Sequence, residues 1–211
     1  MEKGVTLSKE KSNKLLYSIL TTSFAIVWIW AAIHPLHFND WLIENFLVLL
    51  TVPLIFYTSK YFKFSNTSYI MITFFMILHV IGSHYTYSEV PFGVTLGEWW
   101  ETERNMYDRL VHLLFGVLFV YPLFELLKGV AKINGFWTYF VAFMVMSAFA
   151  GFYEVFEWVG AQIVDPEAGA AFLGTQGDEW DAQKDMALAM VGSLFMLTII
   201  SFQNKSKELL S

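Results

Sequence analysis

The chain of 211 residues contains no cysteine. This absence excludes disulfides, metal sites built from thiolates and enzymes with a cysteine nucleophile. Charged residues are also scarce, at 15% of the sequence, whereas 56% of the residues are hydrophobic. That balance is far from the composition of an ordinary soluble domain and indicates a membrane protein. Because the formal net charge is −6, we expect no nucleic-acid partner.

Several motifs of known enzyme classes are absent as well. The sequence has no Gly-x-Ser-x-Gly elbow, no glycine-rich loop that would cradle a phosphate and no dinucleotide-binding fingerprint. Serine catalysis is therefore unsupported, and any chemistry has to come from the other polar residues.

Six apolar runs are long enough to cross a bilayer core, which takes about 17 to 25 residues. They predict transmembrane helices over residues 15–33, 41–58, 67–85, 108–127, 136–160 and 182–202. Little of the chain remains for a second domain. The predicted fold is an all-α polytopic membrane bundle over residues 15–202, flanked by tails 1–14 and 203–211 and surrounded by the lipid bilayer.

The lysines of both tails and of two loops fall on one side of this predicted bundle, and positively charged loops stay cytoplasmic. Acidic residues gather in the opposite loops, where the basic residues are Arg104, Arg109 and Lys184. Both termini are therefore predicted to be cytoplasmic. The segment "GDEWDAQKDM", residues 177–186, then faces outward.

Ionisable side chains recur in the outer half of four predicted spans, where each needs a partner or a function. Positions three or four apart share a helix face, which pairs Asp108 with His112. The same spacing pairs two acids in each of the last two spans. The converging set is His79, Asp108, His112, Glu154, Glu157, Asp181 and Asp185.

Imidazoles and carboxylates without thiolates suit a divalent Zn, Mn or Fe ion. We interpret one subset as metal ligands: His79, Asp108, His112, Glu157 and Asp185. Glu154 and Asp181 are interpreted as catalytic residues. Arg109 and Lys184 are positioned in the sequence to hold a phosphate or carboxylate of a lipid or envelope substrate.

Structural roles are alternatives for several of these residues. Asn105 and Asp178 are typical helix caps, each with an Asp three residues further on. This explanation fails for His112 and Asp185, which lie a turn deeper, where no backbone N–H needs a cap. A lone buried histidine such as His79 is usually just hydrogen-bonded, and Glu154 and Glu157 can extend towards the lipid headgroups.

Two further segments have simple structural interpretations. Glu125, near the inner end of the fourth span, is expected to pair with Lys128. The run "GEWWETERNMY", residues 97–107, is typical of an amphipathic segment that lies on the outer membrane surface.

Four stretches resemble the YjdF-like family of bacterial inner-membrane proteins: "HVIGSHYTYSEVPFG", "DRLVHLLFG", "YEVFEW" and "GTQGDEWDAQKDM". The resemblance covers residues 15 to 200. It implies a multi-span protein of the inner membrane and names no reaction. The signature positions that it implies are His79, His84, Tyr85, Tyr87, Asp108, Arg109, His112, Glu154, Glu157, Asp178, Trp180, Asp181, Gln183 and Asp185.

Three functions remain as hypotheses: a metal-dependent enzyme acting on a lipid or envelope substrate at the outer leaflet, a cation or proton transporter, and a non-catalytic envelope protein. Transport requires polar groups that continue to the inner side. The inner halves of the spans offer little beyond Glu125, Ser147, Ser193 and Thr198. The enzyme hypothesis is therefore favoured.

Overall fold

The computed structural model describes residues 2–163, 169 and 172–209, and the regular structure in these ranges is entirely helical. Six long helices have the length and composition of membrane spans. They are α1 (Glu2–Ala31), α2 (Phe38–Thr58), α3 (Asn66–Tyr85), α5 (Tyr107–Gly129), α6 (Phe136–Ile163) and α8 (Asp181–Leu209). The prediction of an all-α bundle with six spans is confirmed.

The helix ends differ from the predicted ones mainly at the two tails. α1 already begins at Glu2, and α8 continues to Leu209. Neither tail contains a proline, and Glu10 and Lys14 form an ion pair of 2.8 Å one turn apart, which supports a helix in water. The spans themselves are Glu10–Ala31 in α1 and Asp181–Ser206 in α8.

Two short helices join α3 to α5. These are η1 (Tyr87–Glu89) and α4 (Pro91–Trp99). The helical part of the predicted surface segment thus starts earlier than residue 97, because Pro91 occupies the first turn of α4, where a missing N–H costs nothing. It ends at Trp99, and Glu101 then adopts a φ of 53°.

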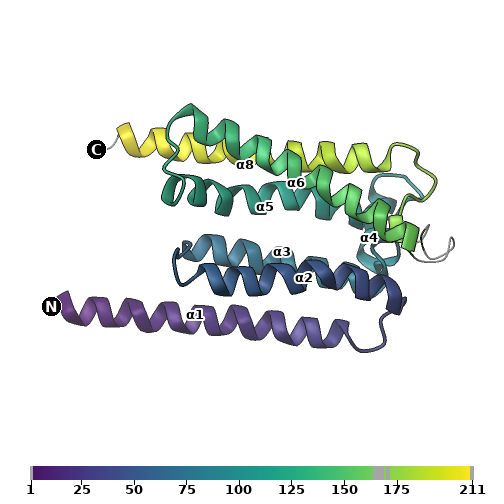
Figure 1. The fold of residues 1–211 in the computed structure, drawn as a ribbon, viewed down its shortest axis with the longest axis horizontal. Helices are drawn as coiled ribbons and strands as arrows, with labels where there is room; N and C mark the ends of the chain where they lie inside the picture. The colour runs from purple at the N-terminus through teal and green to yellow at the C-terminus, as the bar shows by residue number, and fades with distance from the viewer. Residues whose placement is uncertain (1, 164–168, 170–171, 210–211) are drawn as a thin grey trace.

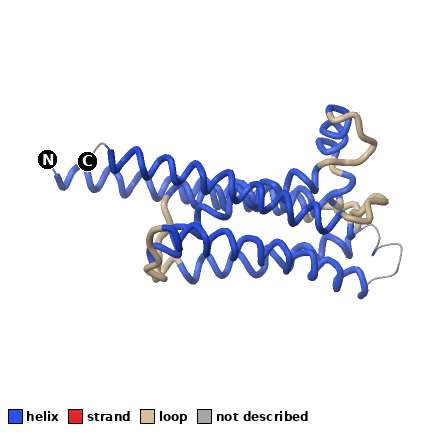
Figure 2. The backbone as a smooth tube through the Cα atoms, turned by 90° about the horizontal axis from the view of Figure 1, so that it is seen from above, coloured by secondary structure: helices blue, strands red, loops and turns tan. Residues whose placement is uncertain are grey.

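The long helices form two groups of three, α1–α2–α3 and α5–α6–α8 (Figure 1). α3 packs against α5 and so joins the groups. Both chain ends lie at the same end of the bundle, as an even number of spans requires (Figure 2). α4 lies at the opposite end (Figure 1).

α5 and α8 approach each other closely at two glycines. A Cβ at Gly116 would overlap the Ala189 carbonyl oxygen, and a Cβ at Gly192 would overlap that of Leu113. Small residues allow helix backbones to come together in membranes, where dispersion contacts drive packing. This contact brings the start of α8 next to the start of α5.

Buried side chains divide the bundle into a polar half and an apolar half. In the half that contains the chain ends, α5, α6 and α8 pack through apolar residues such as Val120, Phe124, Met146 and Ile200. The half near α4 buries the charged and polar residues Asp40, Glu44, Asn45, His79, Asp108, Arg109, His112, Asp181 and Asp185. The candidate site lies in this polar half.

Candidate functional site

Three of the predicted ligands lie together between α5 and α8. Asp108, His112 and Asp185 each place one ligand atom so that all three atoms are within 4.8 Å of one another. Asp108 and His112 share a face because they are four residues apart in α5, and the close α5–α8 contact adds Asp185. All three residues are buried.

The imidazole of His112 lies between two carboxylates. Its Nε2 is 3.4 Å from Asp108 Oδ1, and its Nδ1 is 3.7 Å from Glu154 Oε1 on α6. Two buried oxygens near it, Glu154 Oε1 and Asp185 Oδ1, have no hydrogen-bond partner within the described residues. Such oxygens are costly in a membrane interior unless a cation or a proton neutralises them.

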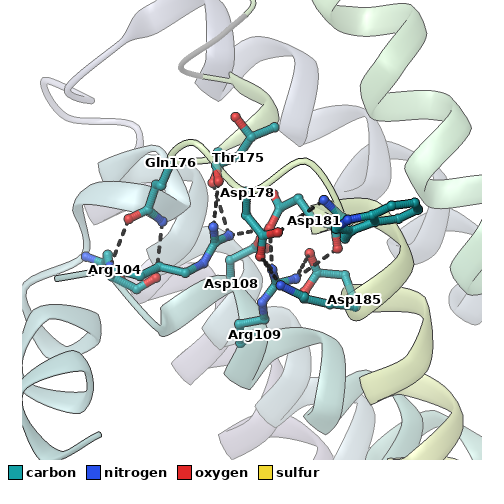
Figure 3. Close-up of polar contacts among 12 residues, drawn as sticks. Arg104, Asp108, Arg109, Thr175, Gln176, Asp178, Asp181 and Asp185 are labelled. Atoms are coloured by element: carbon teal, nitrogen blue, oxygen red, sulfur yellow. Dashed lines mark hydrogen bonds and ion pairs between the residues drawn. The ribbon is translucent and has the colours of Figure 1, made fainter. Parts of the chain in front are cut away.

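Arg109 ties the start of α8 to α5 (Figure 3). Its guanidinium contacts Asp181 Oδ1 and Asp185 Oδ2 at 2.5 Å each, and Asp178 Oδ2 at 3.1 Å. It also donates to the Asp181 carbonyl oxygen at 2.9 Å. These contacts account for the burial of Arg109 and favour a structural role over the predicted binding of a substrate.

A second arginine, Arg104, holds the loop after α4 against the segment before α8. It donates to the carbonyl oxygens of Thr175 and Gly174 and to Asp181 Oδ1, which it contacts at 2.5 Å. Gln176 binds both backbone groups of Asn105, at 2.8 and 3.2 Å (Figure 3). Because two arginines contact one oxygen of Asp181, this acid anchors the start of α8 in the observed geometry, and its catalytic role stays a prediction.

Asp178, which was predicted to be a helix cap, lies three residues before the first residue of α8 and stabilises a turn there, together with two ion pairs. Its Oδ1 accepts from the Trp180 N–H at 3.1 Å, while Oδ2 contacts Lys184 at 2.7 Å and Arg109 at 3.1 Å. The Lys184 ammonium, helped by the Trp180 N–H, lowers the pKa of the Asp178 carboxyl. Asn105 likewise accepts from the Tyr107 N–H at 3.1 Å, at the start of α5.

His79 does not join the three-ligand group. Its Nε2 is 3.0 Å from the Glu44 carbonyl oxygen, and its Nδ1 is 2.5 Å from the Tyr87 hydroxyl. A carbonyl oxygen only accepts, so Nε2 carries the proton and Nδ1 accepts from Tyr87. Burial raises the pKa of the Tyr87 hydroxyl well above its usual value, which keeps it a donor. No lone pair of this ring remains for a metal.

Three further residues that the sequence singled out lie outside the three-ligand group. Glu157 is partly buried one turn after Glu154 and does not belong to the three-ligand group found among the described residues. His84 faces α1, where its Nδ1 is 3.0 Å from the Ala31 carbonyl oxygen. Glu125 does not pair with Lys128, because its Oε2 accepts from the Ser65 N–H and the Ser68 hydroxyl at 3.0 and 2.8 Å.

Sequence reasoning missed Glu44 and Tyr153. The Tyr153 hydroxyl donates to Glu44 Oε2 at 2.8 Å, and its ring lies against that of His112, with 5.9 Å between the ring centroids. Glu44 therefore connects α2 to the neighbourhood of His112. Its position within a predicted span, four residues after Asp40, was the available signal.

Comparison with known proteins agrees with this architecture. The family model described as "Predicted membrane protein (DUF2238)" matches residues 16–206. The chain belongs to this family. It is also similar to Inner membrane protein YjdF of Escherichia coli (strain K12), with 34% identity over 180 residues, which cover 84% of each chain. No solved structure matches. The chain is a multi-pass protein of the bacterial inner membrane.

Proposed function

We propose that Asp108, His112 and Asp185 bind a divalent Zn, Mn or Fe ion, and that the protein is an enzyme acting on a lipid or envelope substrate at the outer leaflet. The observation that carries the proposal is the buried group of ligand atoms within 4.8 Å. Arg109 occupies Asp185 Oδ2, so Oδ1 is the oxygen left to contact a cation. Three protein ligands with one open position are typical of catalytic zinc sites.

Glu154 would act on the other side of the imidazole. A histidine that binds a metal usually donates its second ring N–H to a carboxylate, which fixes the ring and raises its basicity. Glu154 Oε1, 3.7 Å from His112 Nδ1, has the position for this role. It is also the nearest candidate to accept a proton from a substrate or water, with Glu157 one turn away.

A bound metal would polarise a phosphoryl or carbonyl oxygen and lower the pKa of a coordinated water. The residues of the chain would position the substrate. Lys184, whose side chain is 55% exposed, remains a candidate to contact a substrate anion. Trp99, Trp100 and Trp180 are exposed in the segments around this end of the bundle, and tryptophan is enriched at the level of lipid headgroups. Arg109 and Asp181 would hold α8 in place.

Transport is the weaker alternative. A cation crossing the bundle would need polar groups along its whole length. The half beyond the candidate site instead packs through apolar side chains, including Val120, Met146 and Leu197. This difference favours chemistry at one membrane surface over passage through the protein.

Surface labelling tests the outward orientation, and the absence of natural cysteine makes single replacements easy to interpret. Cysteine at exposed Glu98 in α4 should react with an impermeant thiol reagent added to intact spheroplasts. Cysteine at exposed Asn134, between α5 and α6, should react only after lysis. The opposite pattern would place the candidate site on the cytoplasmic side.

Elemental analysis tests the metal. Protein purified without chelator should contain about one Zn, Mn or Fe ion per chain. Asp108→Asn should lose most of it, because an amide is a poorer ligand for such cations. The variant should remain folded, because among the described residues the Asp108 side chain forms an ion pair with His112 alone, at 3.4 Å. Asp178→Asn, which removes an acid outside the group, is the matched control and should retain the metal.

Catalysis is tested separately. Lipid and envelope extracts of cells that overproduce the wild-type chain should differ from those of cells that overproduce Asp108→Asn at equal protein levels. Identical extracts from both strains would argue for a non-catalytic metal protein. Folded wild-type protein without metal, even after dialysis against each ion, would refute the proposed centre itself.

A further inference from the structure

A second polar feature lies at the opposite end of the bundle, far from the three-ligand group. An open cavity of about 570 Å³ is lined by the loop between α2 and α3, the end of α5 and the end of α8. This volume is within the range of small-molecule pockets. Its lining includes Lys63, Lys128, Phe64, Phe124, Gln203 and Asn204.

The charged wall of this cavity favours an anion. Neither Lys63 nor Lys128 has a carboxylate within ion-pair distance in the part of the chain that the structure describes. Glu125 also lines the cavity, but its Oε2 binds the Ser65 N–H and the Ser68 hydroxyl at the start of α3. The carboxylate is thus engaged by the N-terminus of α3, where the helix dipole favours a negative charge.

The remaining wall favours an amphiphile over a small ion. Phe62, Phe64, Tyr121, Phe124 and Ile200 present apolar surface to the same cavity. The Lys128 ammonium lies 5.8 Å from the centroid of the Phe124 ring, so charge and aromatic surface adjoin directly.

The depth of the cavity matches a lipid headgroup. Its polar lining residues Lys63, Lys128 and Gln203 lie within three positions of the span ends Asn66, Gly129 and Ser206. Lysines and aromatic rings near span ends are at the level of phospholipid phosphates and the first acyl carbons.

We infer that this cavity binds the phosphate-bearing headgroup of an acidic phospholipid from the leaflet on the side of the chain ends. Lys63 and Lys128 contact the phosphate, and the amides of Gln203 and Asn204 contact the polar remainder of the headgroup. The aromatic wall packs against the glycerol and the upper acyl chains. This site is independent of the proposed metal centre.

Native mass spectrometry of detergent-purified protein tests the inference, with phosphatidylglycerol and phosphatidylcholine of matched acyl chains as competing probes. Wild type should retain phosphatidylglycerol preferentially. A lysine near a membrane surface contributes about a fivefold gain in affinity for acidic lipid, so Lys63→Gln with Lys128→Gln should weaken binding about 25-fold. Either single variant should weaken it about fivefold if the double variant does not fold.

A matched control uses two other lysines close to the same span ends. Lys60→Gln with Lys132→Gln removes the same charge from exposed positions that do not line the cavity. Solvent screens exposed charges that do not contact the bound lipid, so in detergent this pair should change binding by about twofold at most. Equal losses in both pairs would mean that general surface charge, not this cavity, attracts the lipid. No preference for phosphatidylglycerol, or equally tight binding of soluble glycerol 3-phosphate, would likewise overturn the assignment.

Discussion

His79 and His112 lie in the same polar half of the bundle, yet their surroundings differ in charge. The ring of His79 contacts a tyrosine hydroxyl and a backbone carbonyl oxygen, both neutral, at 2.5 and 3.0 Å. The ring of His112 faces the carboxylates of Asp108 and Glu154 at 3.4 and 3.7 Å. Burial alone therefore does not distinguish the two histidines, because both are buried.

The two surroundings also differ in how completely their polar atoms are satisfied. Both nitrogens of His79 have partners at hydrogen-bonding distance, which is the usual state of a structural histidine. Near His112, one oxygen of Asp185 and one of Glu154 have no hydrogen-bond partner among the described residues. Carboxylates gathered around one imidazole favour the binding of a cation, which would relieve their mutual repulsion.

Among the variants around the two histidines, the largest loss of stability is expected for a substitution of Arg109. Arg109→Gln removes one of two basic partners from Asp178 and Asp181, which keep Lys184 and Arg104, and leaves the buried Asp185 with no ion pair among the described residues. Breaking a buried ion pair on one side costs about 3–5 kcal/mol, so thermal unfolding in detergent should occur at a markedly lower temperature.

Lys184→Gln provides the control for Arg109, because it removes the exposed partner of Asp178 and should leave the unfolding temperature nearly unchanged. If Arg109→Gln unfolded like the wild type, Arg109 would not be the residue that anchors α8. Its predicted role in substrate binding would then regain support.

A smaller effect is expected in the surroundings of His79. Tyr87→Phe keeps the ring packed on Gly82 but removes the hydroxyl that donates to His79. Hydrogen bonds inside membrane proteins contribute about 0.6 kcal/mol on average, so unfolding should shift only slightly and metal content should not change. Loss of metal in Tyr87→Phe would connect the His79 network to the metal centre and weaken the contrast.

The sequence was sufficient to predict the six spans, because apolar length and lysine placement are local properties. The sequence was also sufficient to predict that Asp108, His112 and Asp185 lie at similar depth in the membrane. The rise per residue and the spacing along each helix determine that depth. The sequence did not separate His112 from His79, because the partners of His79 come from α2 and η1, and helix depth does not reveal which neighbours face a ring.

The structural roles of Asp181 and Arg109 could not be predicted from the sequence either, because they arise from contacts between distant segments of the chain. Arg104 reaches Asp181 from a loop, 77 positions away in the sequence, and no spacing rule relates these residues. Glu44 was not among the predicted site residues, although it is a carboxylate within a span and such a group needs a partner or a function. Its partner Tyr153 lies 109 positions away on α6, and no spacing rule relates the two residues.

Metal analysis of His112→Gln beside His79→Gln directly tests whether His112, and not His79, binds the proposed metal. Each variant removes one buried imidazole from the same half of the bundle, so both have a similar cost in packing. His79→Gln should retain nearly the wild-type metal content, whereas His112→Gln should lose most of it while remaining folded. Retention in His112→Gln together with loss in His79→Gln would contradict the assignment of the metal to Asp108, His112 and Asp185.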